Sequence, residues 1–167
     1  MEYPETIKEF NVSTGVVTRS FDLSGTMGGS SSSGLEALTF VPDESSSEGG
    51  YFYAGHQGEG AIYVFELPIE SSSSSTTVSF IDSFKPDTSK TRDISGLHYE
   101  ASNELLYVVY DQYNAILELE IDDSYPDNSY VDSWTLYGDN QEGIAVGPNC
   151  ELFISEDDGN VRLYEVQ

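Results

Sequence analysis

The sequence predicts an all-β fold made of repeated strand units, and three observations carry this prediction. A unit of short strands and turns recurs at a spacing of roughly 40 to 60 residues. Its strands alternate apolar and polar side chains or form short apolar runs. No stretch of useful length has apolar residues at the helical period of 3.6. Repeats of this kind are typical of β-propeller blades, so we expect a propeller segment.

The N-terminal residues 1–24 predict the last two strands of a blade. Residues 6–12 and 16–23 alternate apolar and polar side chains around a Ser-Thr-Gly turn, which is the pattern of a two-stranded hairpin. Residues 25–33 form a Gly/Ser tract that is too polar to bury, and we expect it to be a linker or an exposed loop.

Two complete blades are expected over residues 34–85 and 86–138, and residues 139–167 predict a third blade that stops after three strands. The strands of the complete blades are expected at 35–41, 51–56, 62–67 and 78–84, then at 94–99, 106–111, 116–121 and 130–136. The insertions 43–50 and 70–77 are rich in Ser and acids, so we place them on the surface, where they add reach or solubility rather than chemistry.

A stack of about three to three and a half four-stranded blades does not close a ring, because propellers close with about four to eight. An open stack also leaves unpaired strand edges and a bare apolar face at both ends. We therefore expect part of a larger or oligomerically completed ring, in which a protein partner or the rest of the same polypeptide contributes the missing blades. The isolated chain is expected to be marginally stable or oligomeric.

The composition limits the partners. Among 167 residues, 30 Asp and Glu stand against six Lys and Arg, and the formal net charge is −24. This charge repels phosphate backbones and anionic lipids, so we expect no nucleic-acid binding and no membrane insertion, and cations are favoured. The single cysteine, Cys150, excludes an internal disulfide. The N-terminus is acidic where a secretion signal would be basic, so we expect any such signal to lie outside this chain.

Three segments share a strand motif. Residues 93–99 read D-I-S-G-L-H-Y, residues 141–146 read Q-E-G-I-A-V, and residues 34–40 read G-L-E-A-L-T-F. They resemble strands of SdiA-regulated, phytase-like β-propellers and, less closely, those of NHL-type propellers. The phytase-like members are calcium-dependent phosphohydrolases, whereas the SdiA-regulated members are mostly extracytoplasmic proteins of undefined activity. The resemblance implies a propeller with a calcium site, and it does not by itself imply catalysis.

Five acids near strand ends are candidate ligands for Ca²⁺, which takes six to eight oxygen ligands. First strands line the channel of a propeller, and the motif's Glu position holds Glu36, Ser95 and Glu142 in turn. Second strands are expected to end in His56, Asp111 and Asp157. The alternative is that the acids accept hydrogen bonds from backbone amides and join the blades. The candidates are Glu36, Asp93, Asp111, Glu142 and Asp157. Residues 156–160 are rich in oxygen ligands, but they lack the EF-hand spacing and are simpler to interpret as a hairpin turn.

Three further residues are candidates to face a ligand. His56 could act as a base or metal ligand beside its glycine-rich turn. Arg92 and Glu156 lie at strand ends. A phosphate-cleaving site needs several basic side chains, and only Arg92 is near the strand ends, with Lys85 and Lys90 on the preceding loop. We therefore predict no catalytic residue.

Two surface features complete the set. A carbohydrate-binding platform would require Tyr113, Tyr125 and Tyr130 to cluster on one exposed face. Asn11 begins a glycosylation sequon that would be used in a secreted eukaryotic protein. Together the features predict a non-catalytic, calcium-binding propeller module of an extracellular or cell-surface protein, which mediates assembly or ligand contact. The alternatives are a calcium-dependent phytase-like phosphoesterase and a carbohydrate-binding surface.

Overall fold

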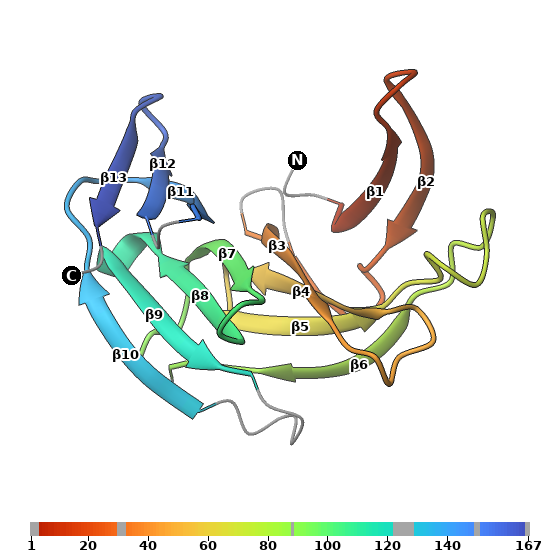
Figure 1. Ribbon diagram of the computed structural model, residues 1–167, viewed down its shortest axis with the longest axis horizontal. Helices are drawn as coiled ribbons and strands as arrows, with labels where there is room; N and C mark the ends of the chain where they lie inside the picture. Colours follow the sequence, from red (N-terminus) through yellow and green to blue (C-terminus); the bar gives the residue numbers. More distant parts are fainter. Residues whose placement is uncertain (1–3, 30–32, 88, 122–128, 149–150, 166–167) are drawn as a thin grey trace.

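The computed structural model describes residues 4–29, 33–87, 89–121, 129–148 and 151–165. They form four antiparallel sheets that follow one another in an open arc (Figure 1). Within these ranges the only helix is a single 3₁₀ turn, Asp111–Tyr113. The all-β prediction is confirmed. In the same ranges, no helix has the length and apolar character needed to span a membrane.

The sheets contain two, four, four and three strands, and the strands of each sheet pair in chain order. The first sheet is β1 (Thr6–Asn11) and β2 (Val16–Asp22). The second is β3 (Leu35–Pro42), β4 (Gly50–His56), β5 (Ala61–Glu66) and β6 (Ser79–Phe84). The third is β7 (Ile94–Glu100), β8 (Leu105–Tyr110), β9 (Ala115–Glu120) and β10 (Ser129–Thr135). The fourth is β11 (Gln141–Val146), β12 (Glu151–Glu156) and β13 (Val161–Glu165).

The first strands of the last three sheets lie together on the inside of the arc. Strand β7 contacts both β3 and β11, while β6 and β10 lie at the outer rim (Figure 1). Each of these three first strands has a small residue near its start, and neighbouring first strands approach each other closely there. A Cβ at Gly96 of β7 would lie 3.2 Å from the Cα of Gly143 in β11. The Gly of the repeated motif therefore permits neighbouring sheets to pack against each other.

Each of these first strands carries a one-residue bulge at the same place. The register against the second strand shifts between Leu35 and Ala37, between Ile94 and Gly96, and between Gln141 and Gly143. The bulged residues are Glu36, Ser95 and Glu142, the three residues that the motif aligns with one another. A bulge leaves its residue outside the pairing ladder and turns it away from its neighbours.

The same register corrects one alignment made from the sequence. Leu35, Ile94 and Gln141 pair with His56, Tyr110 and Glu156 respectively. His56 therefore does not share a position with Asp111 and Asp157, since these acids lie one residue further along. The residue that shares their position is Gln57. The error arose because an apolar pattern does not distinguish strand ends that differ by one residue. The pairing partners in the structure do distinguish them.

The core consists of three apolar clusters, one between each pair of neighbouring sheets. Between the second and third sheets, Tyr53 and Ile62 pack against Leu106 and Val108. Between the hairpin and the second sheet, the cluster includes Met27, which is fully buried. Met27 lies in the Gly/Ser tract that the sequence suggested was too polar to bury, so one apolar side chain is enough to anchor this tract.

The Ser-rich insertion after β5 is more ordered than its composition suggests. Arg19 of β2 is only 7% exposed, and its Nη1 donates hydrogen bonds to three carbonyl oxygens around this insertion. The buried carboxylate of Glu48 accepts hydrogen bonds from the backbone N–H groups of Glu70 and Ser71, at 2.7 and 3.1 Å. These hydrogen bonds hold the insertion against the first and second sheets, so its role goes beyond solubility.

Candidate functional site

The candidate site lies at one end of the second, third and fourth sheets, where their first strands β3, β7 and β11 begin. There the turn after each second strand folds back on the residue that precedes the first strand of the same sheet. The N–H groups of Gln57, Asp111 and Asp157 donate to the carbonyl oxygens of Gly34, Asp93 and Asn140 at 2.9, 3.1 and 3.0 Å. The same hydrogen bond therefore occurs in the second, third and fourth sheets. The structural repeat brings these turns to one end of the molecule.

Asp93 joins the second and third sheets. Its N–H donates to the carbonyl oxygen of Gln57 at 2.5 Å, and its Oδ2 accepts from the N–H of Gln112 at 2.9 Å. Asp93 has a φ of 76°, and Asn140 at the same position has a φ of 58°. Asp and Asn tolerate this left-handed conformation better than most residues, since their short side chains bond locally. The position thus favours Asp or Asn on structural grounds.

Asp111 joins the third and fourth sheets, because its Oδ1 accepts a hydrogen bond from the N–H of Gln141 at 2.8 Å. Burial raises the pKa of the Asp111 carboxyl, and the negative charges of Asp93 and Asp157 raise it further. Three of the five predicted calcium ligands are therefore close enough to interact electrostatically. The Asp111 carboxylate also accepts a backbone hydrogen bond between sheets, and the Asp93 carboxylate accepts one within the third sheet, which agrees with the alternative interpretation of these acids.

The other two predicted ligands occupy the bulges. Glu36 is half-buried in β3, and Glu142 is exposed in β11. Within the described ranges, no three His, Cys, Asp or Glu side chains are arranged so that they could hold a metal ion.

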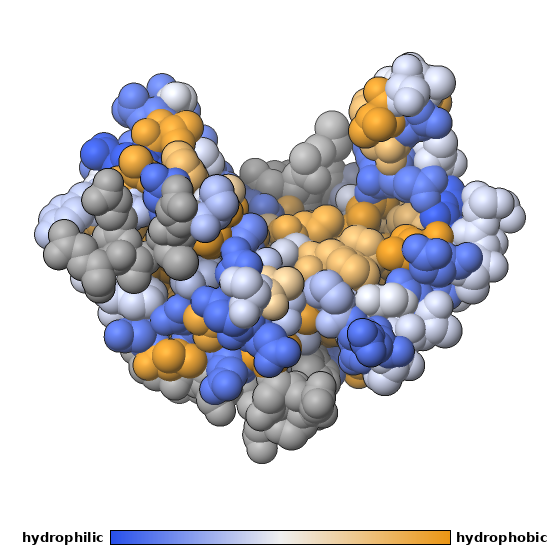
Figure 2. All heavy atoms as spheres, in the orientation of Figure 1, coloured by the Kyte–Doolittle hydropathy of each residue, from blue (hydrophilic) through white to orange (hydrophobic). Residues whose placement is uncertain are grey.

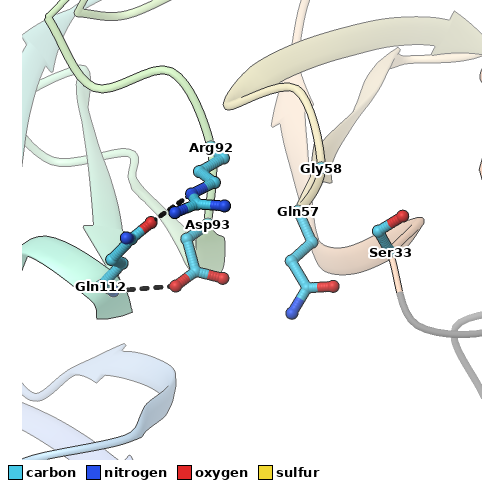
Figure 3. Close-up of a pocket in the computed structure, with 6 residues that line it drawn as sticks. All are labelled: Ser33, Gln57, Gly58, Arg92, Asp93 and Gln112. Atoms are coloured by element: carbon cyan, nitrogen blue, oxygen red, sulfur yellow. Dashed lines mark hydrogen bonds between the residues drawn. The ribbon is translucent and has the colours of Figure 1, made fainter.

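A cavity of about 500 Å³ lies beside these acids, at the junction of the second and third sheets. Figure 3 shows Arg92, Asp93 and Gln112 on one side, and Gln57, Gly58 and Ser33 on the other. Arg92 Nε donates to the side-chain oxygen of Gln112 at 2.5 Å. The side-chain oxygen of Gln57 is buried and has no hydrogen-bond partner among the residues that the structure describes.

This cavity offers hydrogen-bonding groups of both kinds to a small polar ligand. The Arg92 guanidinium and the Gln112 amide are donors, and Asp93 and Gln57 contribute acceptor oxygens. Sequence reasoning identified Arg92 and Asp93 but not the two glutamines. Their only signal was their place in the turn after a second strand, where Gln57 corresponds to Asp111.

Two predicted ligand-facing residues are engaged in internal contacts. His56 is 3% exposed; its Nδ1 accepts from the N–H of Glu59 at 3.2 Å, and its Nε2 bonds the carbonyl oxygen of Gly28. These partners assign the proton to Nε2, so His56 ties the Gly/Ser tract to the second sheet. Glu156 is 6% exposed and its Oε1 lies 2.5 Å from Nε of Arg162.

The predicted surface features are only partly described. Asn11 is exposed at the end of β1, where its Oδ1 accepts from the N–H groups of Ser13 and Thr14 in the β1–β2 turn at 3.0 and 3.1 Å. Tyr113 is exposed and contacts the ring of Tyr110 edge-on. Tyr125 and the side chain of Tyr130 lie outside the described residues, so the proposed tyrosine platform stays a prediction.

No family model matches this chain, and no curated protein matches it in sequence. Solved structures do resemble it. A putative 6-phosphogluconolactonase from Bacteroides fragilis superimposes with a TM-score of 0.55 at 16% identity, over 77% of this chain and 34% of the other. The β-propeller domain of Cps50 (Swd1) from Myceliophteria thermophila gives 0.55 at 14% identity, over 97% of this chain and 47% of the other. The chain has the fold of a partial β-propeller.

A third similar structure is the periplasmic gluconolactonase PpgL from Pseudomonas aeruginosa, with a TM-score of 0.54 at 14% identity over 75% of this chain and 34% of the other. The chain thus spans about a third to a half of the length of these three propellers. At these identities the likeness concerns the fold. The narrower resemblance to SdiA-regulated and phytase-like propellers stays a prediction.

Proposed function

We propose that this chain is a non-catalytic β-propeller module that mediates assembly by docking a further blade on its fourth sheet. The observation that supports this is an apolar row across the face of that sheet which points away from the third sheet. Ala145, Phe153 and Leu163 pair in register across β11, β12 and β13. Phe153 is 36% exposed and Leu163 is 52% exposed.

The structural repeat supports a further blade as the occupant of this face. By register, Phe153 corresponds to Tyr107 and Tyr53, which are 7% and 2% exposed because the next sheet packs on them. Val161 is 65% exposed, whereas its counterparts Ile116 and Ile62 are 1% and 0% exposed. The fourth sheet thus presents a blade-to-blade interface in which one side is uncovered.

The other end of the arc also carries exposed apolar side chains. Phe10, Val16 and Val17 of the β1–β2 hairpin are 55%, 56% and 46% exposed. In Figure 2 both raised arms of the molecule show hydrophobic residues among polar ones. Two uncovered ends of different structure favour head-to-tail contact, which closes into a ring when the geometry permits. In the isolated chain, we propose that the added blade comes from a second copy.

The calcium prediction belongs to the same proposal. The net charge of −24 and the charges of Asp93 and Asp157 that act on Asp111 support the attraction of a divalent cation to this end of the sheets. The described acids do not form a ready set of three ligands there, and Glu36 and Glu142 are further candidate ligands. The acid excess also supports an extracellular or cell-surface setting, where calcium is plentiful. We propose no catalytic role, because Arg92 is the sole basic side chain among the residues that line the 500 Å³ cavity.

The solution mass of the whole chain tests the assembly. Light scattering after size exclusion should show a mass that rises with concentration. Phe153→Glu with Leu163→Glu should reduce it to that of a monomer, since charges on the docking face cannot be buried without a partner. Val131→Glu is the matched control, because Val131 is 48% exposed on the outer strand β10. A monomer at every concentration would overturn the assembly proposal.

Thermal unfolding tests the cation separately. With excess EDTA and then millimolar calcium, a native state that binds the ion should melt at a higher temperature in calcium. Asp111→Asn and Asp157→Asn should each reduce this shift, while Asp22→Asn on the hairpin should leave it unchanged. An equal shift in all variants would show that calcium only screens surface charge.

A further inference from the structure

A second cavity, of about 710 Å³, lies between the second and third sheets at the opposite end of their strands from Asp93. The turn after β3, the start of β4, the end of β7 and the turn before β8 form it. It shares no residue with the cavity beside Asp93. Its size lies within the range of about 300 to 1,000 Å³ that small-molecule sites occupy.

Three tyrosines form the aromatic part of this cavity. Tyr51 and Tyr53 come from β4, and Tyr99 comes from β7. Tyr53 is 2% exposed, and its ring meets Phe84 edge-on with a centroid distance of 6.3 Å. The N–H of Tyr99 donates to Oγ1 of Thr39 at 3.1 Å, which holds β7 against β3. Tyr51 and Tyr99 are partly buried and pack against the apolar cluster that contains Tyr53, so packing holds all three residues in place.

Three carboxylates line the same cavity: those of Asp43, Glu44 and Glu104. No Lys, Arg or His is among the lining residues, and the ion pairs found in the described ranges involve other acids. Asp43 Oδ1 accepts from Oγ and N–H of Ser45 at 2.6 and 2.7 Å, and these hydrogen bonds lower the pKa of the Asp43 carboxyl. The cavity thus holds negative charge with no internal cation to balance it.

The tyrosines stay neutral beside these acids. Burial raises the pKa of Tyr51 and of Tyr99, and the charges of Asp43 and Glu104 respectively raise them further. A neutral phenol offers a cation the electron-rich face of its ring and the lone pairs of its oxygen.

We propose that this cavity binds an organic cation, namely a quaternary or methylated ammonium group. A Ca²⁺ ion would need six to eight oxygen ligands in place of its water shell, and aromatic rings do not replace them. An alkylated ammonium is weakly hydrated, carries its charge over an apolar surface, and is bound by tyrosine rings with nearby carboxylates. Two sources share this chemistry: a free choline-like molecule and a methylated lysine side chain of a protein.

Titration of the full 167-residue chain with choline tests the proposal, with the neutral isostere 3,3-dimethylbutan-1-ol as the matched ligand. Choline should bind at least about tenfold more tightly than the isostere, because only choline gains the electrostatic and cation–π terms. A trimethyl-lysine peptide and its unmethylated form, titrated in parallel, distinguish the two sources. Equal affinity for choline and the isostere, or no binding of any of these four ligands, would overturn the proposal.

Variants then locate the site. Glu104→Gln and Tyr99→Leu should each weaken choline binding by about fivefold or more. Glu120→Gln is the control, because Glu120 is an exposed acid on β9 that does not line the cavity. Glu104→Gln keeps the side-chain shape and the residue's local conformation, so a loss of binding with unchanged thermal unfolding reports on the site itself. Unchanged affinity in both variants would place choline binding outside this cavity. Displacement of choline by millimolar calcium in the wild type, but in neither variant, would show that the cavity binds cations in general and not alkylated ammonium groups in particular.

Discussion

Gly55 of β4 and Ile94 of β7 meet so closely that a Cβ at Gly55 would lie 2.6 Å from Cγ2 of Ile94. This contact joins the second and third sheets near their inner strands. Ile94 is fully buried, and the Cβ of Ala37 would lie only 3.0 Å from the added methyl group. The packing between neighbouring sheets therefore depends on the absence of a side chain at Gly55.

We expect Gly55→Ala to lower the free energy of unfolding by about 1–3 kcal/mol, as overpacking usually does. Urea unfolding measures it. Ile94→Ala opens space at the same point, so the double variant should be more stable than the sum of the single effects predicts. Strict additivity of the two changes would show that they do not meet in the native state.

Arg19 holds the Ser-rich insertion through hydrogen bonds to the carbonyl oxygens of Pro68, Ser72 and Ser75 at 2.7, 2.6 and 3.3 Å. Its Nε also donates to Glu9 at 2.8 Å. Lysine has no planar fork of donors and cannot make these contacts together. Arg19→Lys should therefore cost about 2 kcal/mol and expose residues 70–77 to limited proteolysis. Lys8→Ala on the same hairpin, where the side chain is exposed, should change neither readout.

His56 makes one hydrogen bond with each ring nitrogen, and both partners are backbone groups. His56→Ala leaves the Glu59 N–H and the Gly28 carbonyl without these partners, so we expect a loss of about 1–3 kcal/mol. Hydrogen exchange should quicken at residues 24–29, which His56 ties to the second sheet. His98→Ala, on β7, is the comparison; equal exchange in both variants would contradict this role.

Asp111 gives a pH prediction, because burial and the charges of Asp93 and Asp157 raise the pKa of its carboxyl in the folded state above the usual value of 3.8. A raised carboxyl pKa destabilises the charged native state above that pKa, and the penalty disappears when pH falls below 3.8. In Asp111→Asn, the side-chain amide oxygen can still accept the hydrogen bond from the Gln141 N–H. Asp111→Asn should therefore raise the melting temperature at pH 7 in EDTA and leave it unchanged near pH 3. A lower melting temperature at pH 7 would show that the charge itself stabilises the junction.

Much of the fold could be read from the chain. The period-two pattern of β1 and β2 and the short apolar runs of β8 and β12 predicted strands, and their recurrence predicted sheets of two, four, four and three strands. The motif also aligned Glu36, Ser95 and Glu142, although only the structure shows that each of them is bulged. The candidate site was less accessible: Gln57 and Gln112 have no distinctive chemistry in isolation, and His56 was aligned one residue away from its structural position.

The sequence by itself determined the all-β class, the repeated unit and the negative charge, because local periodicity and composition do not depend on distant contacts. Only the tertiary structure decided which groups meet. It joined Asp93 to Gln57, buried Met27 and Arg19, and gathered Tyr51, Tyr53 and Tyr99 around one cavity. Pairing register and sheet packing set these contacts, and both arise from interactions between residues far apart in the chain.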